Sequence, residues 1–92
     1  MNDMKMVLNK CFGGFSIPEE LCERWDCEPY DDVMRNHPEL VEFVESHDGR
    51  YEEGNSCLMV VEFPDWASDW EFNEYDGYEG ITYVLNGKLH HV

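Results

Sequence analysis

The longest apolar run in the chain lies within Cys57–Phe63 and predicts its central strand. Residues 57–61 are five consecutive apolar side chains, and two of them are β-branched valines. The run is bounded by Gly54-Asn55-Ser56 before it and by Pro64 after it. A short apolar run between turn residues is typical of a strand that is covered on both faces. We therefore expect the rest of the chain to pack around this strand.

Four other stretches alternate apolar with polar residues, which is the period of a strand with one buried face. They are Met4–Phe12, Trp70–Asp76, Ile81–Leu85 and Lys88–Val92. Asp76-Gly77 predicts a turn, and Asn86-Gly87 is typical of two-residue hairpin loops. We therefore expect the last two stretches to pair as a β-hairpin.

The first helix is expected to run from Ser16 to about Trp25. The segment Ser16-Ile17-Pro18-Glu19 matches a capping box, in which Ser16 is the N-cap and Glu19 reaches back to it. Proline is tolerated in the first turn of a helix. The residues that follow, 27–36, have no clear period and contain a proline, so they predict a loop.

A second helix is expected after Asn36, which stands three residues before Glu39 and repeats the capping-box spacing around Pro38. Gly49 predicts its end, because glycine readily adopts the left-handed conformation that follows many helices. The apolar arc of this helix comprises Leu40, Val41, Phe43, Val44 and His47.

The order of these elements predicts an α+β fold. We expect a single domain over residues 1–92, with a four- to five-stranded, mainly antiparallel or mixed sheet and two helices packed on one face. The length suits one domain, and 42% hydrophobic with 14% aromatic residues is ordinary for a chain that folds by itself.

The formal net charge of −15, from 21 acidic against 6 basic residues, restricts the partners. Repulsion disfavours direct binding to nucleic acid and to an anionic membrane surface. Such an excess fits either a merely solvated surface or a surface that meets a basic partner. The first residues have no signal-peptide pattern and no run is long enough to span a membrane, so we expect a cytoplasmic protein.

The four cysteines do not match a metal-binding pattern. Cys22 and Cys27 have four residues between them, whereas structural zinc sites commonly have two. In a reducing cytoplasm we expect Cys11, Cys22, Cys27 and Cys57 to be free thiols. No local signature joins Cys11 or Cys27 to a histidine base. We therefore expect no metal, no cofactor, no catalytic residues and no enzymatic activity.

From Tyr51 to Gly87 the chain has no lysine or arginine, and acidic residues are interleaved with aromatic ones. Aromatic residues in the core with acids in solvent would explain Phe72 and Ile81. This interpretation explains Trp66 and Tyr78, both in predicted loops, less well. A surface with charges of one sign and exposed aromatic side chains is typical of an interaction surface. Together with three glutamates of the second helix, the stretch supplies candidate partner-binding residues: Glu39, Glu42, Glu45, Asp65, Trp66, Asp69, Glu71, Glu74, Asp76 and Tyr78.

A second candidate site lies where the first strand meets the first helix. Two glycines ahead of a helix N-terminus would leave free backbone N–H groups directed at one spot, and such a spot can hold an anion. The alternative is a tight turn with packed phenylalanines on either side. The candidate ligand-binding residues are Lys10, Gly13, Gly14, Phe15 and Ser16.

Four segments carry a resemblance to a known group of proteins. They are Lys5–Ser16 with its Gly13-Gly14-Phe15 element, His37–Val41, Val61–Asp65, and Trp70–Gly77 with its Glu74-Tyr75-Asp76-Gly77 element. These segments resemble small uncharacterised proteins that are common in bacteriophages and prophages, over most of the chain, although the tail His90-His91-Val92 departs from them. The resemblance implies a phage-borne accessory protein, and the family offers no established active site.

Charge, the absence of catalytic motifs and this resemblance lead to one main hypothesis. The protein is expected to inhibit a basic host protein, such as a defence nuclease, a nucleoid protein or a polymerase, by occupying its nucleic-acid site with carboxylates. The alternative is a small-ligand-binding protein, for example a sponge for a nucleotide signal, that uses the Gly13-Gly14 loop. The approach of an anion to a strongly negative body disfavours this alternative. The sequence also allows a homodimer.

Overall fold

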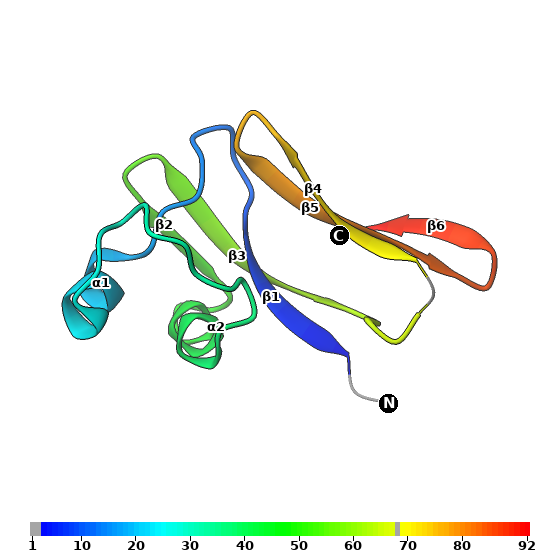
Figure 1. The fold of residues 1–92 in the computed structure, drawn as a ribbon, viewed down its shortest axis with the longest axis horizontal. Coiled ribbons are helices and arrows are strands. Elements are labelled where there is room, and N and C mark those ends of the chain that lie inside the picture. The colour runs from blue at the N-terminus through cyan, green and yellow to red at the C-terminus, as the bar shows by residue number, and fades with distance from the viewer. Residues whose placement is uncertain (1–2, 68) are drawn as a thin grey trace.

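Over residues 3–67 and 69–92, which are the residues it describes, a computed structural model shows two helices and six strands (Figure 1). β1 (Met4–Asn9), β3 (Ser56–Phe63) and β2 (Arg50–Glu53) form a first antiparallel sheet with β3 in the centre. The predicted central strand is confirmed. β2 was not predicted, because its four residues have no apolar alternation.

β4 (Trp70–Tyr75), β5 (Tyr78–Leu85) and β6 (Lys88–His91) form a second antiparallel sheet with β5 in the middle. Its two loops are Asp76-Gly77 and Asn86-Gly87, and all four residues have φ between 49° and 88°. These values are typical of the type I′ turn, whose twist suits a two-residue hairpin. Both predicted turns are confirmed. The prediction of one sheet with four to five strands is wrong, because the strands divide into two sheets.

The first sheet is the middle of three layers (Figure 1). One of its faces packs against α1 (Glu19–Trp25) and α2 (Pro38–Glu45), and the α+β class is confirmed. Burial of apolar side chains in this layer is the main stabilising contribution. Its buried cluster comprises Val7, Ile17, Leu21, Cys22, Leu40, Val41, Phe43, Val44 and Leu58.

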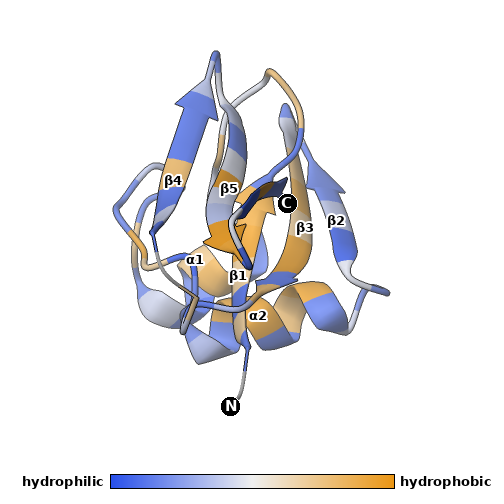
Figure 2. Cartoon of the chain, turned by 90° about the vertical axis from the view of Figure 1, so that its right-hand side faces the viewer, coloured by the Kyte–Doolittle hydropathy of each residue, from blue (hydrophilic) through white to orange (hydrophobic). Residues whose placement is uncertain are grey.

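The other face of the first sheet packs against the second sheet. Leu8 of β1, Phe63 of β3 and Ile81 of β5 are all 0% exposed and form this smaller core. Val7 and Leu8 are adjacent in β1, and since neighbouring strand residues point to opposite faces, each belongs to a different core. In Figure 2 the hydrophobic colour follows β1, β3 and part of β5. β3 is therefore covered on both faces, as its apolar run predicts.

α1 begins at Glu19 and not at Ser16, so the predicted capping box is wrong. The hydroxyl of Ser16 lies 2.7 Å from the hydroxyl of Ser56 instead. The backbone N–H of Glu19 donates to the carboxylate of Glu53 in β2, at 2.9 Å. A carboxylate from a distant strand thus satisfies the helix N-terminus. The predicted end at Trp25 is confirmed.

α2 begins at Pro38, and its N-cap is His37 rather than the predicted Asn36. Nδ1 of His37 accepts a hydrogen bond from the backbone N–H of Glu39, at 3.1 Å. Gly49 has a φ of 80° and follows the helix, as predicted. Within the described residues, neither helix has the length and apolar character needed to cross a membrane.

A buried ion pair connects the layers. Glu79 of β5 is 4% exposed and accepts two hydrogen bonds from the guanidinium of Arg35, at 2.9 and 3.2 Å. It also accepts from the backbone N–H of Asn9, at 3.0 Å. The buried side chain of Asn9 accepts from the N–H of Cys57 and donates to the carbonyl of Gly77. This network joins β1, β3 and β5. The burial of Glu79 was not predicted, because nothing in the acidic pattern of the sequence distinguishes it from its exposed neighbours.

The Gly13-Gly14 loop lies between two hairpin turns. A Cβ atom on Gly13 would stand 1.8 Å from the carbonyl oxygen of Asn55, in the turn between β2 and β3. A Cβ atom on Gly77 would stand 2.7 Å from the backbone nitrogen of Gly14. Only glycine allows backbone segments to approach so closely. The loop therefore holds the turn of one sheet against the turn of the other.

Candidate protein-binding surface

β4 is the most exposed strand of the protein. It is an outer strand of the second sheet, and all six of its residues are exposed. Phe72 is 42% exposed, so its assignment to the core is wrong, whereas Ile81 on the neighbouring strand is fully buried, as expected. Phe72 is exposed because β5 already covers the first sheet, and β4 lies beyond β5 at the margin of the second sheet. Figure 2 shows β4 at this margin with mostly hydrophilic residues.

The pairing register divides the residues of β4 between two faces. Phe72 is opposite Ile81, so Trp70 and Phe72 lie on the face that is directed towards the first sheet. Glu71 and Tyr75 lie on the outer face. The inner face thus carries two aromatic rings and Glu74, and the outer face carries Glu71 and the ring of Tyr75.

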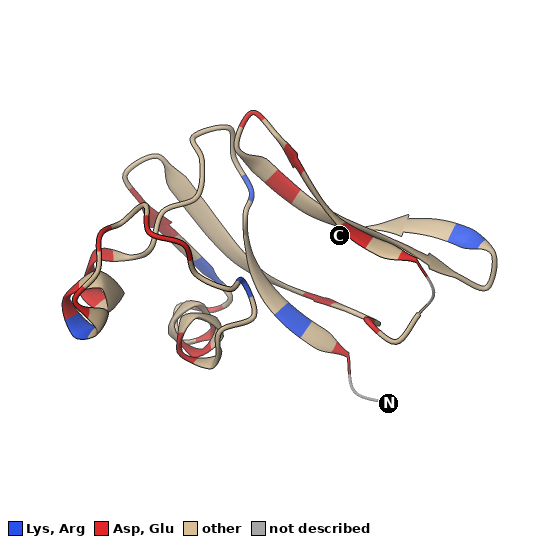
Figure 3. Cartoon of the chain, viewed as in Figure 1, with Lys and Arg blue, Asp and Glu red and all other residues tan. Residues whose placement is uncertain are grey.

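The acids near β4 have no cation partner within the described part of the chain. The ion pairs of that part involve other carboxylates, and the basic residue of the second sheet is Lys88 at the start of β6 (Figure 3). Unpaired like charges on one strand and its turns repel one another. A cationic partner would relieve this repulsion. The acids concerned are the predicted Asp65, Asp69, Glu71, Glu74 and Asp76.

The acids of α2 are in a different state. Glu45 lies 2.7 Å from the ammonium of Lys5, and this hydrogen bond raises the pKa of the lysine. Glu39 accepts from the indole N–H of Trp25 at 3.1 Å and lies 3.5 Å from Arg24, which together hold the pKa of Glu39 below its usual value. Glu42 is exposed and forms no ion pair within the described residues. Two of the three predicted helical sites are therefore already neutralised.

The structure does not bring all the predicted partner-binding residues together. α2 lies on one side of the first sheet and the second sheet lies on the other (Figure 1). Asp65 and Trp66 belong to the loop between β3 and β4, where the indole N–H of Trp66 donates to Asp3 at 3.1 Å. Tyr78, expected in a loop, is the first residue of β5. The helical and sheet candidates form two separate surfaces.

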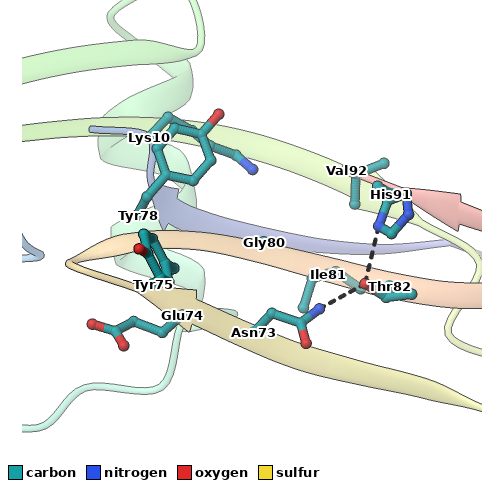
Figure 4. Close-up of a pocket in the computed structure, with 10 residues that line it drawn as sticks. All are labelled: Lys10, Asn73, Glu74, Tyr75, Tyr78, Gly80, Ile81, Thr82, His91 and Val92. Atoms are coloured by element: carbon teal, nitrogen blue, oxygen red, sulfur yellow. Dashed lines mark hydrogen bonds between the residues drawn. The ribbon is translucent and has the colours of Figure 1, made fainter. Parts of the chain in front are cut away.

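The outer face of the second sheet is hollowed into an open groove of about 520 Å³ (Figure 4). On its floor, Thr82 accepts a hydrogen bond from the side chain of Asn73 at 2.6 Å and lies 3.2 Å from Nδ1 of His91. At its rim, the ammonium of Lys10 donates to the carbonyl of Glu79 at 2.8 Å and lies 5.2 Å from the ring centroid of Tyr78. Burial lowers the pKa of Lys10. Aromatic rings and hydrogen-bonding groups therefore share this face with the acids.

The five candidate ligand-binding residues around Gly13-Gly14 do not converge on one site. Lys10 is directed to the groove, and the ring of Phe15 lies 3.5 Å below the guanidinium carbon of Arg35. A small hollow of about 280 Å³ does border Gly13, Gly14 and Ser16. The carboxylate of Glu53 also lines this hollow and occupies the helix N-terminus. An anion there would meet a negative charge.

The thiols are not arranged for catalysis in the described residues. Cys11 donates to the carbonyl of Asn55 at 3.0 Å and lies 3.5 Å from the side-chain oxygen of Asn9, with no histidine bonded to it. Burial raises the pKa of Cys22 to about 11 and also raises that of Cys57, which disfavours the reactive thiolate. No group of three potential metal ligands gathers in the part of the chain that the structure describes.

Comparisons with known proteins add no relative. The chain matches no protein-family model, and no curated protein and no solved structure is significantly similar to it. The resemblance to phage proteins therefore stays a prediction from the sequence motifs.

Proposed function

We propose that the protein binds a basic partner protein through its second sheet. The observation that carries the proposal is the state of β4, whose six residues are exposed and whose acids have no cation partner in the described chain. A basic surface would neutralise these carboxylates without first breaking an internal ion pair. The exposed aromatic rings of Trp70, Phe72 and Tyr75 add apolar area of the kind that anchors protein interfaces.

A merely solvated acidic surface is the competing interpretation. The chain has only 6 basic residues, and Lys5, Arg24, Arg35 and Arg50 are all in ion pairs. Ion pairs thus hold most of the positive charge, and among the described residues unpaired acids remain around α1 and in the loop before α2 as well as beside β4 (Figure 3). The second sheet differs in that exposed rings of Trp70, Phe72 and Tyr75 stand beside its acids, which solubility does not require.

The partner class follows from the charge. Proteins with strongly basic surfaces include those that bind nucleic acids, and a carboxylate surface can occupy the site of a phosphate backbone. We propose an inhibitor that a phage produces in the host cytoplasm against a nuclease, nucleoid protein or polymerase. The resemblance of the motifs to phage proteins and the free thiols support this setting.

The test is capture of a partner from bacterial lysate by the tagged protein, with DNA as competitor. The double variant Glu71→Lys, Glu74→Lys should lose the partner, and both duplex DNA and high salt should release it from the native protein, because rim charges are screened within about 8 Å at physiological ionic strength. The matched control is Glu23→Lys, Glu42→Lys, which makes the same charge change at two exposed helical positions that form no ion pair within the described chain. Equal capture by both double variants, or a failure of DNA to compete, would contradict the proposal.

The small-ligand alternative has weaker support. The groove of Figure 4 offers one ammonium group, Lys10, and its ammonium already donates to a backbone carbonyl. The hollow at Gly13-Gly14 contains a carboxylate. Mass spectrometry of the purified protein distinguishes the two functions, because a co-purifying nucleotide would support the alternative.

A further inference from the structure

The hydrogen-bond pattern of the second sheet leaves one side of β4 open. Val84 donates its N–H to the carbonyl of Asp69, at 3.2 Å. In an antiparallel ladder every second residue bonds to the same neighbour, so Glu71, Asn73 and Tyr75 also direct their backbone groups to β5. Trp70, Phe72 and Glu74 therefore direct their N–H and C=O groups away from the sheet.

These outward groups bond to no protein group in the described residues, whereas another long edge is partly covered. On β1, the N–H of Val7 donates to the carbonyl of Arg35 at 2.7 Å, so the loop before α2 partly satisfies that edge. The edge strands β2 and β6 have four residues each, and β4 has six. A long edge with free backbone groups is a template for another strand.

The side chains of β4 define which strand would fit. Its outer face presents Glu71 and the ring of Tyr75, and its inner face presents the half-exposed rings of Trp70 and Phe72, with Glu74 at the turn end. A matching strand would carry basic residues on the first face and apolar residues on the second. A second copy of β4 would instead set acids beside acids, which destabilises cross-strand pairs.

We propose that β4 accepts an extended basic segment of the partner as a fourth, antiparallel strand of the second sheet. The segment alternates basic residues, which face Glu71, with apolar residues, which extend the surface of Trp70 and Phe72. Its backbone hydrogen bonds go to Trp70, Phe72 and Glu74. This inference rests on the proposed function and adds the mode of binding to it.

The test uses a synthetic probe, an eight-residue peptide of alternating lysine and valine, and the unchanged protein. In the proposed arrangement the valines lie on the same face as Phe72, and in an antiparallel pair they are the residues whose N–H groups bond to β4. N-methylation of the valines should therefore weaken binding about tenfold or more, since several hydrogen bonds are lost. N-methylation of the lysines, with the same composition and charge, should leave the affinity within about threefold because those N–H groups face away.

A variant of the protein gives an independent measurement. Phe72→Pro removes an N–H that faces solvent, a substitution that edge strands tolerate, and it should weaken peptide binding as strongly as valine methylation. Phe72→Ala retains the N–H and should bind more tightly than Phe72→Pro. Amide hydrogen exchange on the unchanged protein should show that the peptide protects Trp70, Phe72 and Glu74.

Failure of this inference differs from failure of the proposed function. If both N-methylated peptides bind as well as the parent while Glu71→Lys, Glu74→Lys abolishes binding, the acidic surface is used without an added strand, and the inference is wrong. If lysine methylation alone weakens binding, the antiparallel arrangement is wrong. Self-association of the protein, with protection of β4 in the absence of peptide, would assign this edge to a second copy and would also overturn the inference.

Discussion

The helical layer and the second sheet differ in how far their predicted partner-binding acids are paired. In the helical layer the carboxylates of Glu39 and Glu45 are neutralised by Arg24 and Lys5, and the carboxylate of Glu53 caps α1. In the second sheet the one buried acid, Glu79, is paired, while the acids beside β4 have no cation partner among the described residues. The difference teaches that net charge alone does not locate an interaction surface. The internal pairing of each carboxylate has to be known.

The two regions also differ in how they depend on the core. α2 contributes four buried residues, whereas no residue of β4 is buried. Substitutions in the helical layer should therefore change the free energy of unfolding, and substitutions on β4 should change binding.

The largest effect is expected from Leu58→Asp. Leu58 is 1% exposed in the helix-facing core, so the variant would bury an unpaired charge and destabilise the protein by about 4 kcal/mol or more. The control Phe72→Asp should cost less than about 1 kcal/mol because Phe72 is half exposed. Urea unfolding measures both. Similar losses for the two variants would remove the contrast between β3 and β4.

Arg35→Met should have the next largest effect, about 3–5 kcal/mol, because it leaves the buried carboxylate of Glu79 without a cationic partner. The exposed Arg24→Met is the control and should cost less than about 1 kcal/mol. Adding Glu79→Met to Arg35→Met should restore much of the loss. A double variant as unstable as the single one would show that the ion pair is not what connects the second sheet to the first.

Gly13→Ala tests the joint between the two sheets. The added Cβ would overlap the carbonyl of Asn55, so the loop has to shift, and we expect a loss of about 2 kcal/mol. Gly54→Ala, in open space with a φ of 57°, should cost only about 1 kcal/mol of backbone strain. Thermal unfolding compares the two. Equal shifts in melting temperature would mean that the close approach of Gly13 to Asn55 is not needed for stability.

The smallest effect concerns alkaline pH. The hydrogen bond to Glu53 and burial raise the pKa of Tyr51 to about 12 from its usual 10. The folded protein therefore holds this proton more tightly than the unfolded chain, and the stability it contributes is present below pH 10 and lost as the pH rises towards 12. Tyr51→Phe should reduce the fall in unfolding free energy between pH 10 and pH 12, which urea unfolding at several pH values measures. The control Tyr75→Phe, on exposed β4, should leave the pH dependence of the unfolding free energy as it is in the unchanged protein.

The elements that the sequence determined by itself are those with local causes. The apolar run of β3, the glycine turns at Asp76-Gly77 and Asn86-Gly87, and the apolar arc of α2 all depend on neighbours within a few residues. Turn conformation follows from which residues accept a positive φ, and helix periodicity follows from backbone geometry. These features could therefore be predicted without knowledge of the fold.

The tertiary structure alone decided the features that depend on distant residues. Glu53 replaced the predicted cap of α1 because β2 carries its carboxylate to Glu19. Glu79 is buried and Phe72 exposed, although both lie on strands of alternating pattern, because Glu79 pairs with Arg35 beneath β5 while Phe72 lies at the margin of the second sheet. Hydrophobic periodicity defines two faces of a strand, but what packs against each face is decided by the arrangement of the other layers. The division into two sheets, and with it the open edge of β4, therefore follows from packing across the whole chain.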